Sequence, residues 1–215
     1  MSNQTTLDKM IDSGVVGVIR TESSEKLLKV SEALKVGGVS CIEVAMTTPD
    51  ALTVIEEVSG QLDDVLIGAG TVLDAETARS AILAGAEYLV SPTTDLDMIE
   101  MCKRYDKVVA PGAFTPTEVM KAWQAGADIV KVFPASRLGP KFISDIKAPL
   151  PQASLMPTGG VSQDNAADYI RAGADAVCAG SALLDKQAIA KENWEVLTSN
   201  AKQLVEAVKE GRKTL

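Results

Sequence analysis

The chain of 215 residues contains no histidine. This absence excludes a Ser-His-Asp triad, a Cys-His pair, an HExxH zinc site and any imidazole base. Catalysis by this chain must therefore use carboxylates, lysine, hydroxyl groups or the backbone. No metal site and no cofactor are expected.

Cysteine is also scarce. Cys41, Cys102 and Cys178 are odd in number and far apart, so they form neither a disulfide framework nor a CxxC motif. We expect ordinary packing for all three.

Acidic residues outnumber basic residues, and long apolar runs are missing. The net charge is −8, which argues against a nucleic-acid partner or an anionic membrane, because phosphate groups are met by basic surfaces. The start of the chain lacks the features of a signal peptide, and no apolar run approaches the roughly 18 to 20 residues of a membrane span. A cytoplasmic location is expected.

Hydrophobic residues make up 46% of the chain, enough for one sizeable core. Charged residues are spread evenly, and no low-complexity segment or Pro/Ser-rich linker marks a boundary. We therefore expect a single domain over residues 1–215.

Short apolar runs rich in β-branched residues alternate with segments of helical periodicity. The strand candidates are residues 15–20, 39–46, 65–72, 87–92, 107–114, 128–134, 154–161 and 175–183. Helical spacing is clearest in residues 24–35, 75–84, 117–125 and 164–172. Continuous rather than alternating apolar runs indicate parallel strands buried on both faces, so the pattern predicts an α/β fold of the (β/α)8 TIM-barrel type. A doubly wound open sheet is the alternative, but the first strand is not followed by GxGxxG.

Glycines punctuate this pattern in two ways. Gly38, Gly85, Gly126 and Gly173 follow helical segments, where a glycine supplies the left-handed residue past a helix end. Other glycines close the third, fifth and seventh strands, at the end where a barrel builds its active site.

Two charged residues interrupt apolar strands. Ile129, Lys131 and Phe133 share one side of the sixth strand, and Glu43 shares a side of the second strand with Cys41. Because an ionisable group pressed between strand and helix would be badly placed, we assign Lys131 and Glu43 to the barrel interior. A buried salt bridge is one interpretation of this pair, although it would add little stability.

The other interpretation is covalent catalysis. Desolvation disfavours an ammonium group, which leaves more free amine to attack a ketone. Glu43 would then supply the acid/base group that a Schiff-base mechanism needs.

Further motifs indicate an anion-binding site. The loops after strands seven and eight contain Thr158, Gly159, Gly160, Gly180 and Ser181, where barrels often bind phosphate through backbone N–H groups and a helix N-terminus. Tight turns would explain the same glycines. Arg20 and Thr71 close strands one and three, and could hold a carboxylate or phosphate, although Arg20 also fits an ordinary surface cation.

Seven short motifs, in order along residues 7 to 190, resemble the 2-keto-3-deoxy-6-phosphogluconate (KDPG) and 4-hydroxy-2-oxoglutarate (KHG) aldolase family. They are IEV at 42–44, IGAGTV at 67–72, VSP at 90–92, PG at 111–112, KVFPA at 131–135, PTGGV at 157–161 and GS at 180–181.

The resemblance implies a class I aldolase, usually a homotrimer, that needs no metal. Lys131 would form a Schiff base with pyruvate or with the keto group of a keto-acid phosphate, and Glu43 would deprotonate the C4 hydroxyl. Thr71 would bind the pyruvyl carboxylate, and Pro92 and Phe133 would pack around the pyruvyl group. The phosphate would lie on Gly159, Gly160 and Ser181, and the products would be pyruvate and glyceraldehyde 3-phosphate.

One position departs from the family pattern. Well-studied members carry an arginine four residues after the glutamate, where this chain has Thr47. The 6-phosphogalactonate and KHG reactions therefore remain alternatives. Outside the aldolases, a non-catalytic binder of phosphate metabolites and a barrel isomerase or decarboxylase stay open.

Overall fold

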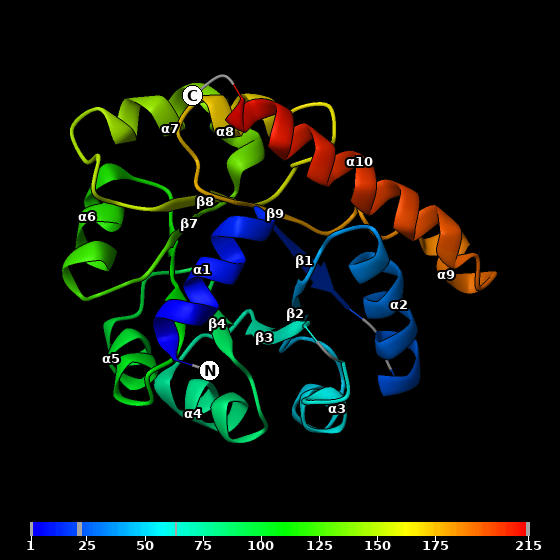
Figure 1. The fold of residues 1–215 in the computed structure, drawn as a ribbon. Helices are drawn as coiled ribbons and strands as arrows, with labels where there is room; N and C mark the ends of the chain where they lie inside the picture. Colours follow the sequence, from blue (N-terminus) through cyan, green and yellow to red (C-terminus); the bar gives the residue numbers. More distant parts are fainter. Residues whose placement is uncertain (1, 21–22, 63, 214–215) are drawn as a thin grey trace.

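The computed structural model describes residues 2–20, 23–62 and 64–213. Helices surround a core of parallel strands (Figure 1). The strands are β1 Val15–Ile19, β2 Cys41–Ala45, β3 Leu66–Gly70, β4 Tyr88–Val90, β5 Val108–Ala110, β6 Gly112–Ala113, β7 Val130–Val132, β8 Leu155–Pro157 and β9 Val177–Ala179. The helices are α1 Asn3–Ser13, α2 Ser24–Val36, α3 Ala51–Val58, α4 Ala75–Leu83, α5 Leu96–Arg104, α6 Pro116–Gln124, α7 Gly139–Lys147, α8 Ala166–Arg171, α9 Lys186–Ala190 and α10 Trp194–Arg212.

The strands close into a barrel. One sheet runs β5-β4-β3-β2-β1-β9 and a second runs β6-β7-β8, with parallel pairing throughout. A parallel bridge between Thr158 and Cys178 joins the end of β8 to β9. The predicted (β/α)8 fold is confirmed, and closure excludes the open doubly wound sheet.

The fifth predicted strand is divided in two. Pro111 separates β5, which pairs with β4, from β6, which pairs with β7. Proline has no N–H to donate and interrupts the ladder at this point. The same stretch therefore links the two sheets and completes the barrel.

Helix ends follow the local sequence. The Ser23 side chain caps α2, and Thr115 and Glu118 form a capping box at the start of α6. The glycines predicted to follow helices have positive φ, as the capping interpretation requires. They are Gly38, Gly85, Gly126 and Gly173, with φ of 96°, 109°, 92° and 104°.

The barrel interior is a small apolar cluster separate from the larger core between strands and helices. Met10 of α1 belongs to this interior cluster, and α1 lies across the barrel opening in the view of Figure 1. All three cysteines are buried and unpaired, as expected. Burial raises the pKa of the Cys41 thiol to about 11 and that of Cys102 to about 12, so both stay protonated.

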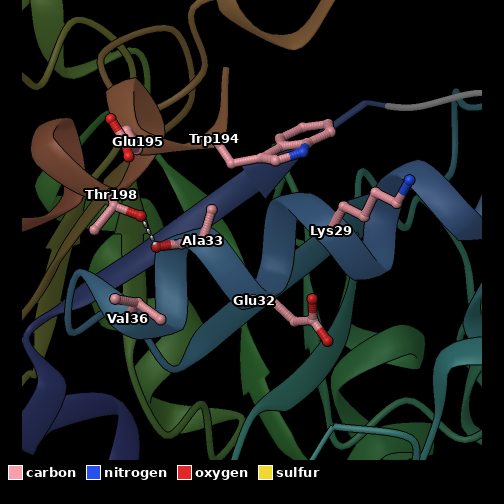
Figure 2. A pocket seen from close by; sticks show the side chains of 7 residues that line it. All are labelled: Lys29, Glu32, Ala33, Val36, Trp194, Glu195 and Thr198. Carbon is pink, nitrogen blue, oxygen red and sulfur yellow. Dashed lines mark hydrogen bonds between the residues drawn. The ribbon is translucent and has the colours of Figure 1, made fainter. Parts of the chain in front are cut away.

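The longest helix, α10, packs on α2 and α8 outside the barrel (Figure 1). The Thr198 hydroxyl donates to the Ala33 carbonyl at 2.9 Å (Figure 2). A side chain at Gly37 would collide with Ala201. An open groove of about 550 Å³ lies between the two helices, lined by Trp194 and Val36 among others (Figure 2). It contains none of the predicted site residues.

The described residues contain neither a membrane-spanning helix nor a metal-binding cluster. Within residues 2–20, 23–62 and 64–213, no helix is both long and apolar enough to cross a membrane. Over the same ranges, no group of three or more acidic or cysteine side chains is placed to hold a metal ion.

Candidate active site

Strand register places Lys131 and Glu43, the two charged residues within apolar strands, inside the barrel. Cys41 and Ile129 belong to the interior cluster, and side chains two residues further along a strand lie on the same side. Glu43 of β2 is 1% exposed and Lys131 of β7 is 5% exposed. Both lie at the base of a cavity of about 400 Å³.

All twelve residues predicted for the site line this one cavity. They are Arg20, Glu43, Thr47, Thr71, Pro92, Lys131, Phe133, Thr158, Gly159, Gly160, Gly180 and Ser181. The structure adds Val18, Val161, Cys178 and Ala179, which sequence reasoning missed. Val18, Cys178 and Ala179 lie in apolar runs, so nothing in the sequence separates them from core residues, whereas Val161 ends the PTGGV motif and could have been included on that ground.

Glu43 occupies space that a glycine leaves free. A Cβ at Gly70, on neighbouring β3, would collide with the Glu43 carboxyl group. The second carboxylate oxygen, Oε2, is buried without a hydrogen-bond partner in the described residues. Desolvation raises the pKa of Glu43, and the positive charges of Lys131 and Arg20 offset only part of this effect. A carboxyl group with a raised pKa is suited to exchanging protons near neutral pH.

Lys131 is held by strand pairing on both sides. It pairs with Gly112 of β6 and Met156 of β8, and its Nζ lies 5.1 Å from the centre of the Phe133 ring. Among the ion pairs within 4.0 Å in the described residues, none joins Lys131 to Glu43. The two groups share a cavity without forming the core salt bridge that was the simpler interpretation.

The loop after β8 presents backbone groups to the cavity. Gly159 and Gly160 have φ of 92° and 76°, a conformation that favours glycine. Asn165 holds this loop, because its Nδ2 donates to the Gly160 carbonyl and its Oδ1 accepts from the Ser162 N–H. Helix α8 begins only at Ala166, so the loop itself faces the cavity.

Other strand ends complete the rim. Thr71 follows β3 with φ of 59°, a left-handed conformation that costs a β-branched residue about 1–3 kcal/mol and is typical of functional sites. Arg20 follows β1 and is exposed, but it also lines the cavity and lowers the pKa of Glu43. Its position is thus compatible with anion binding. Gly112 is needed for close packing, because a side chain there would collide with the backbone of Pro92.

A closed parallel barrel with a buried lysine and glutamate in one cavity is an arrangement suited to Schiff-base chemistry, as used by class I lyases. Residues 7–200 match the family model described as KDPG and KHG aldolase. The chain belongs to the KDPG/KHG aldolase family.

Relatives and solved structures agree with this assignment. The 2-dehydro-3-deoxy-phosphogluconate aldolase of Treponema pallidum is 33% identical, over 90% of this chain and 93% of the relative. The 2-dehydro-3-deoxy-6-phosphogalactonate aldolase of Escherichia coli is 31% identical, over 91% of this chain and 95% of the relative. A solved structure of KDPG aldolase from Legionella pneumophila, with pyruvate captured as a covalent carbinolamine, superposes with a TM-score of 0.85 at 28% identity. That match covers 92% of this chain and 97% of the other.

Proposed function

We propose that this aldolase cleaves 2-keto-3-deoxy-6-phosphogluconate reversibly to pyruvate and glyceraldehyde 3-phosphate, through a Schiff base on Lys131. The observation that carries the proposal is a lysine and a glutamate, both buried, sharing one cavity with no ion pair between them. An amine left without a direct acidic partner is available to a ketone.

The reaction follows from these two groups. The free amine of Lys131 adds to the C2 ketone. The Glu43 carboxylic acid protonates the carbinolamine hydroxyl, which leaves as water to give an iminium ion and the Glu43 carboxylate. Glu43 takes the proton of the C4 hydroxyl as the C3–C4 bond breaks, and the electron pair of that bond moves into the iminium to form an enamine. The aldehyde leaves, the proton returns to C3, and water hydrolyses the iminium to pyruvate and free Lys131.

The remaining cavity residues would bind the two ends of the substrate. Thr71 and Arg20 hold the carboxylate at the rim of β1 and β3, while Pro92 and Phe133 pack around the pyruvyl group. The phosphate lies on backbone N–H groups of the loops that carry Gly159, Gly160 and Ser181, with Thr158 and Gly180 shaping those loops. No metal takes part in this scheme.

Reduction with sodium borohydride in the presence of pyruvate tests the chemistry and the residue together. Peptide mass mapping should find the adduct on Lys131. The Lys131→Ala variant should lose cleavage by at least about a thousandfold, and Lys131→Arg, which keeps the charge, should be equally inactive. An unmodified wild-type protein that remains fully active would overturn the proposal.

Two other substrates belong to the same chemistry. Thr47 occupies the position at which well-studied family members have an arginine that contacts the substrate carboxylate. In addition, one relative is named as an aldolase of the phosphogalactonate epimer. Comparing kcat/KM for KDPG, its galactonate epimer and KHG decides among them. A non-catalytic metabolite binder would instead bind phosphate ligands without borohydride trapping.

We also propose that residues 1–215 form one domain and that the protein works as a cytoplasmic homotrimer. The family resemblance supports the trimer. So do exposed apolar side chains beside the cavity, of which Leu96 and Phe114 are 53% and 43% exposed.

A further inference from the structure

A second polar group lies inside the barrel with Glu43. Tyr88 of β4 is fully buried, and its hydroxyl has no hydrogen-bond partner within the described residues. The Oε2 atom of Glu43 is in the same situation. Buried polar atoms in proteins almost always have partners, so two such atoms in one barrel interior call for an explanation.

Strand register brings the two side chains together. Gly68 of β3 pairs with Glu43 of β2 on one side and lies beside Tyr88 of β4 on the other. A Cβ at Gly68 would lie 2.5 Å from Cε2 and Cζ of Tyr88. The ring therefore crosses over Gly68 toward β2, and its hydroxyl end points to the side of the barrel that carries Glu43.

The apolar side chains that pack with Tyr88 in the interior cluster cannot accept a hydrogen bond from this hydroxyl, and the two thiols of the cluster, Cys41 and Cys178, are weak acceptors. Burial raises the pKa of Tyr88 well above its ordinary value, and the nearby Cys41, Glu43 and Cys178 add smaller contributions in the same direction. The phenol stays protonated and acts as a donor, and an ionised carboxylate is the strongest acceptor close to it.

We propose that Tyr88 is a positioning residue for the acid/base group. Its hydroxyl donates to the Glu43 carboxylate through one bridging water, because the two groups make no direct hydrogen bond, and this favours the ionised form of that carboxylate. This inference rests on the proposed role of Glu43.

Several groups together set the proton affinity of Glu43. Lys131 faces it from β7 and Arg20 from the end of β1, and both stabilise the anion. Cys178 faces it from β9, and its thiol stays protonated because burial raises the pKa. Tyr88 faces it from β4, and its hydroxyl is a stronger neutral donor than the Cys178 thiol.

The Tyr88→Phe variant removes only the hydroxyl. We expect the acid limb of the kcat profile to move up by about one pH unit, as loss of one hydrogen bond to a charged group implies. The plateau at high pH should stay nearly unchanged. The kcat profile is the informative one, because it reports ionisations in the complex, where Lys131 is already bound to substrate.

Tyr169→Phe is the matched control. Tyr169 is also buried, but its hydroxyl donates to the Ala135 carbonyl at 3.0 Å outside the barrel interior. This variant should lower thermal stability and leave the acid limb where it is.

The outcomes separate the two proposals. If borohydride traps Lys131 in wild type and in Tyr88→Phe but the acid limb does not move, the role of Tyr88 is wrong and the aldolase mechanism stands. If Tyr88→Phe changes the thermal stability but not the acid limb, the proposed role of Tyr88 is likewise wrong. If wild type is not trapped, the proposed function fails and the role of Tyr88 fails with it.

Discussion

At the scale of single residues, the site depends on a carboxyl group whose burial lowers the stability of the folded protein. Glu43 is fully buried and its Oε2 has no hydrogen-bond partner in the described part of the chain. Burial disfavours its charged form more than Lys131 and Arg20 favour it. This trade of stability for reactivity is common at active sites.

The stability difference between wild type and the Glu43→Gln variant should depend on pH. A carboxyl group with a raised folded-state pKa contributes stability below its unfolded pKa, and that contribution is lost as the pH rises through the folded pKa. Wild type should therefore gain stability relative to Glu43→Gln as the pH falls through the raised folded-state pKa toward the ordinary glutamate pKa of 4.5. Thermal unfolding of both proteins across this range measures the difference. A constant gap between them would contradict the raised pKa.

The same substitution should remove the acid/base step. We expect kcat for cleavage to fall by about a hundredfold to ten-thousandfold, while borohydride trapping of pyruvate on Lys131 is retained in part. A variant with near wild-type kcat would show that another group moves the proton.

At the scale of elements, β3 shows how a strand can shape a site without contributing to its chemistry. Its two inward glycines leave room for side chains of both neighbours, Tyr88 over Gly68 and Glu43 over Gly70. The sequence placed these glycines in a strand, and the structure shows what fills the space above them.

Alanine substitutions at the two positions should have different effects. Gly70→Ala meets the far end of the flexible Glu43 side chain, so Glu43 shifts and kcat falls at least tenfold with a small loss of stability. Gly68→Ala meets the rigid Tyr88 ring inside a packed barrel, where overpacking costs about 1–3 kcal/mol. Chemical denaturation and steady-state kinetics on both variants make the comparison. Equal stability losses would contradict this account of β3.

At the scale of the whole molecule, a depression with several exposed apolar side chains lies next to the active-site cavity. Leu96 and Phe114 line it, and it shares Pro92 and Phe133 with the cavity. Exposed apolar surface of this kind is typical of contacts between subunits. A second copy of the chain bound here would also bury part of the rim of the active-site cavity.

Sedimentation equilibrium should give the mass of three chains. Leu96→Asp combined with Phe114→Asp should reduce it to one chain, because charges at the centre of an apolar interface are strongly disfavoured. Val36→Asp is the control, since Val36 is 69% exposed on α2, beside the groove with α10, and should leave the assembly intact. A wild-type protein that sediments as a monomer would overturn the homotrimer.

The amino-acid sequence by itself determined the alternation of strands and helices, because buried parallel strands and amphipathic helices each leave a distinct apolar period. It also placed Lys131 and Glu43 inside, since a charge in an apolar strand has few acceptable positions. Only the tertiary structure decided that Pro111 divides the fifth strand and that the lysine and glutamate form no ion pair. It alone placed the Tyr88 ring over Gly68, beside the strand of Glu43. These features depend on how neighbouring strands align around a closed barrel, and that alignment is fixed by packing between residues distant in the chain.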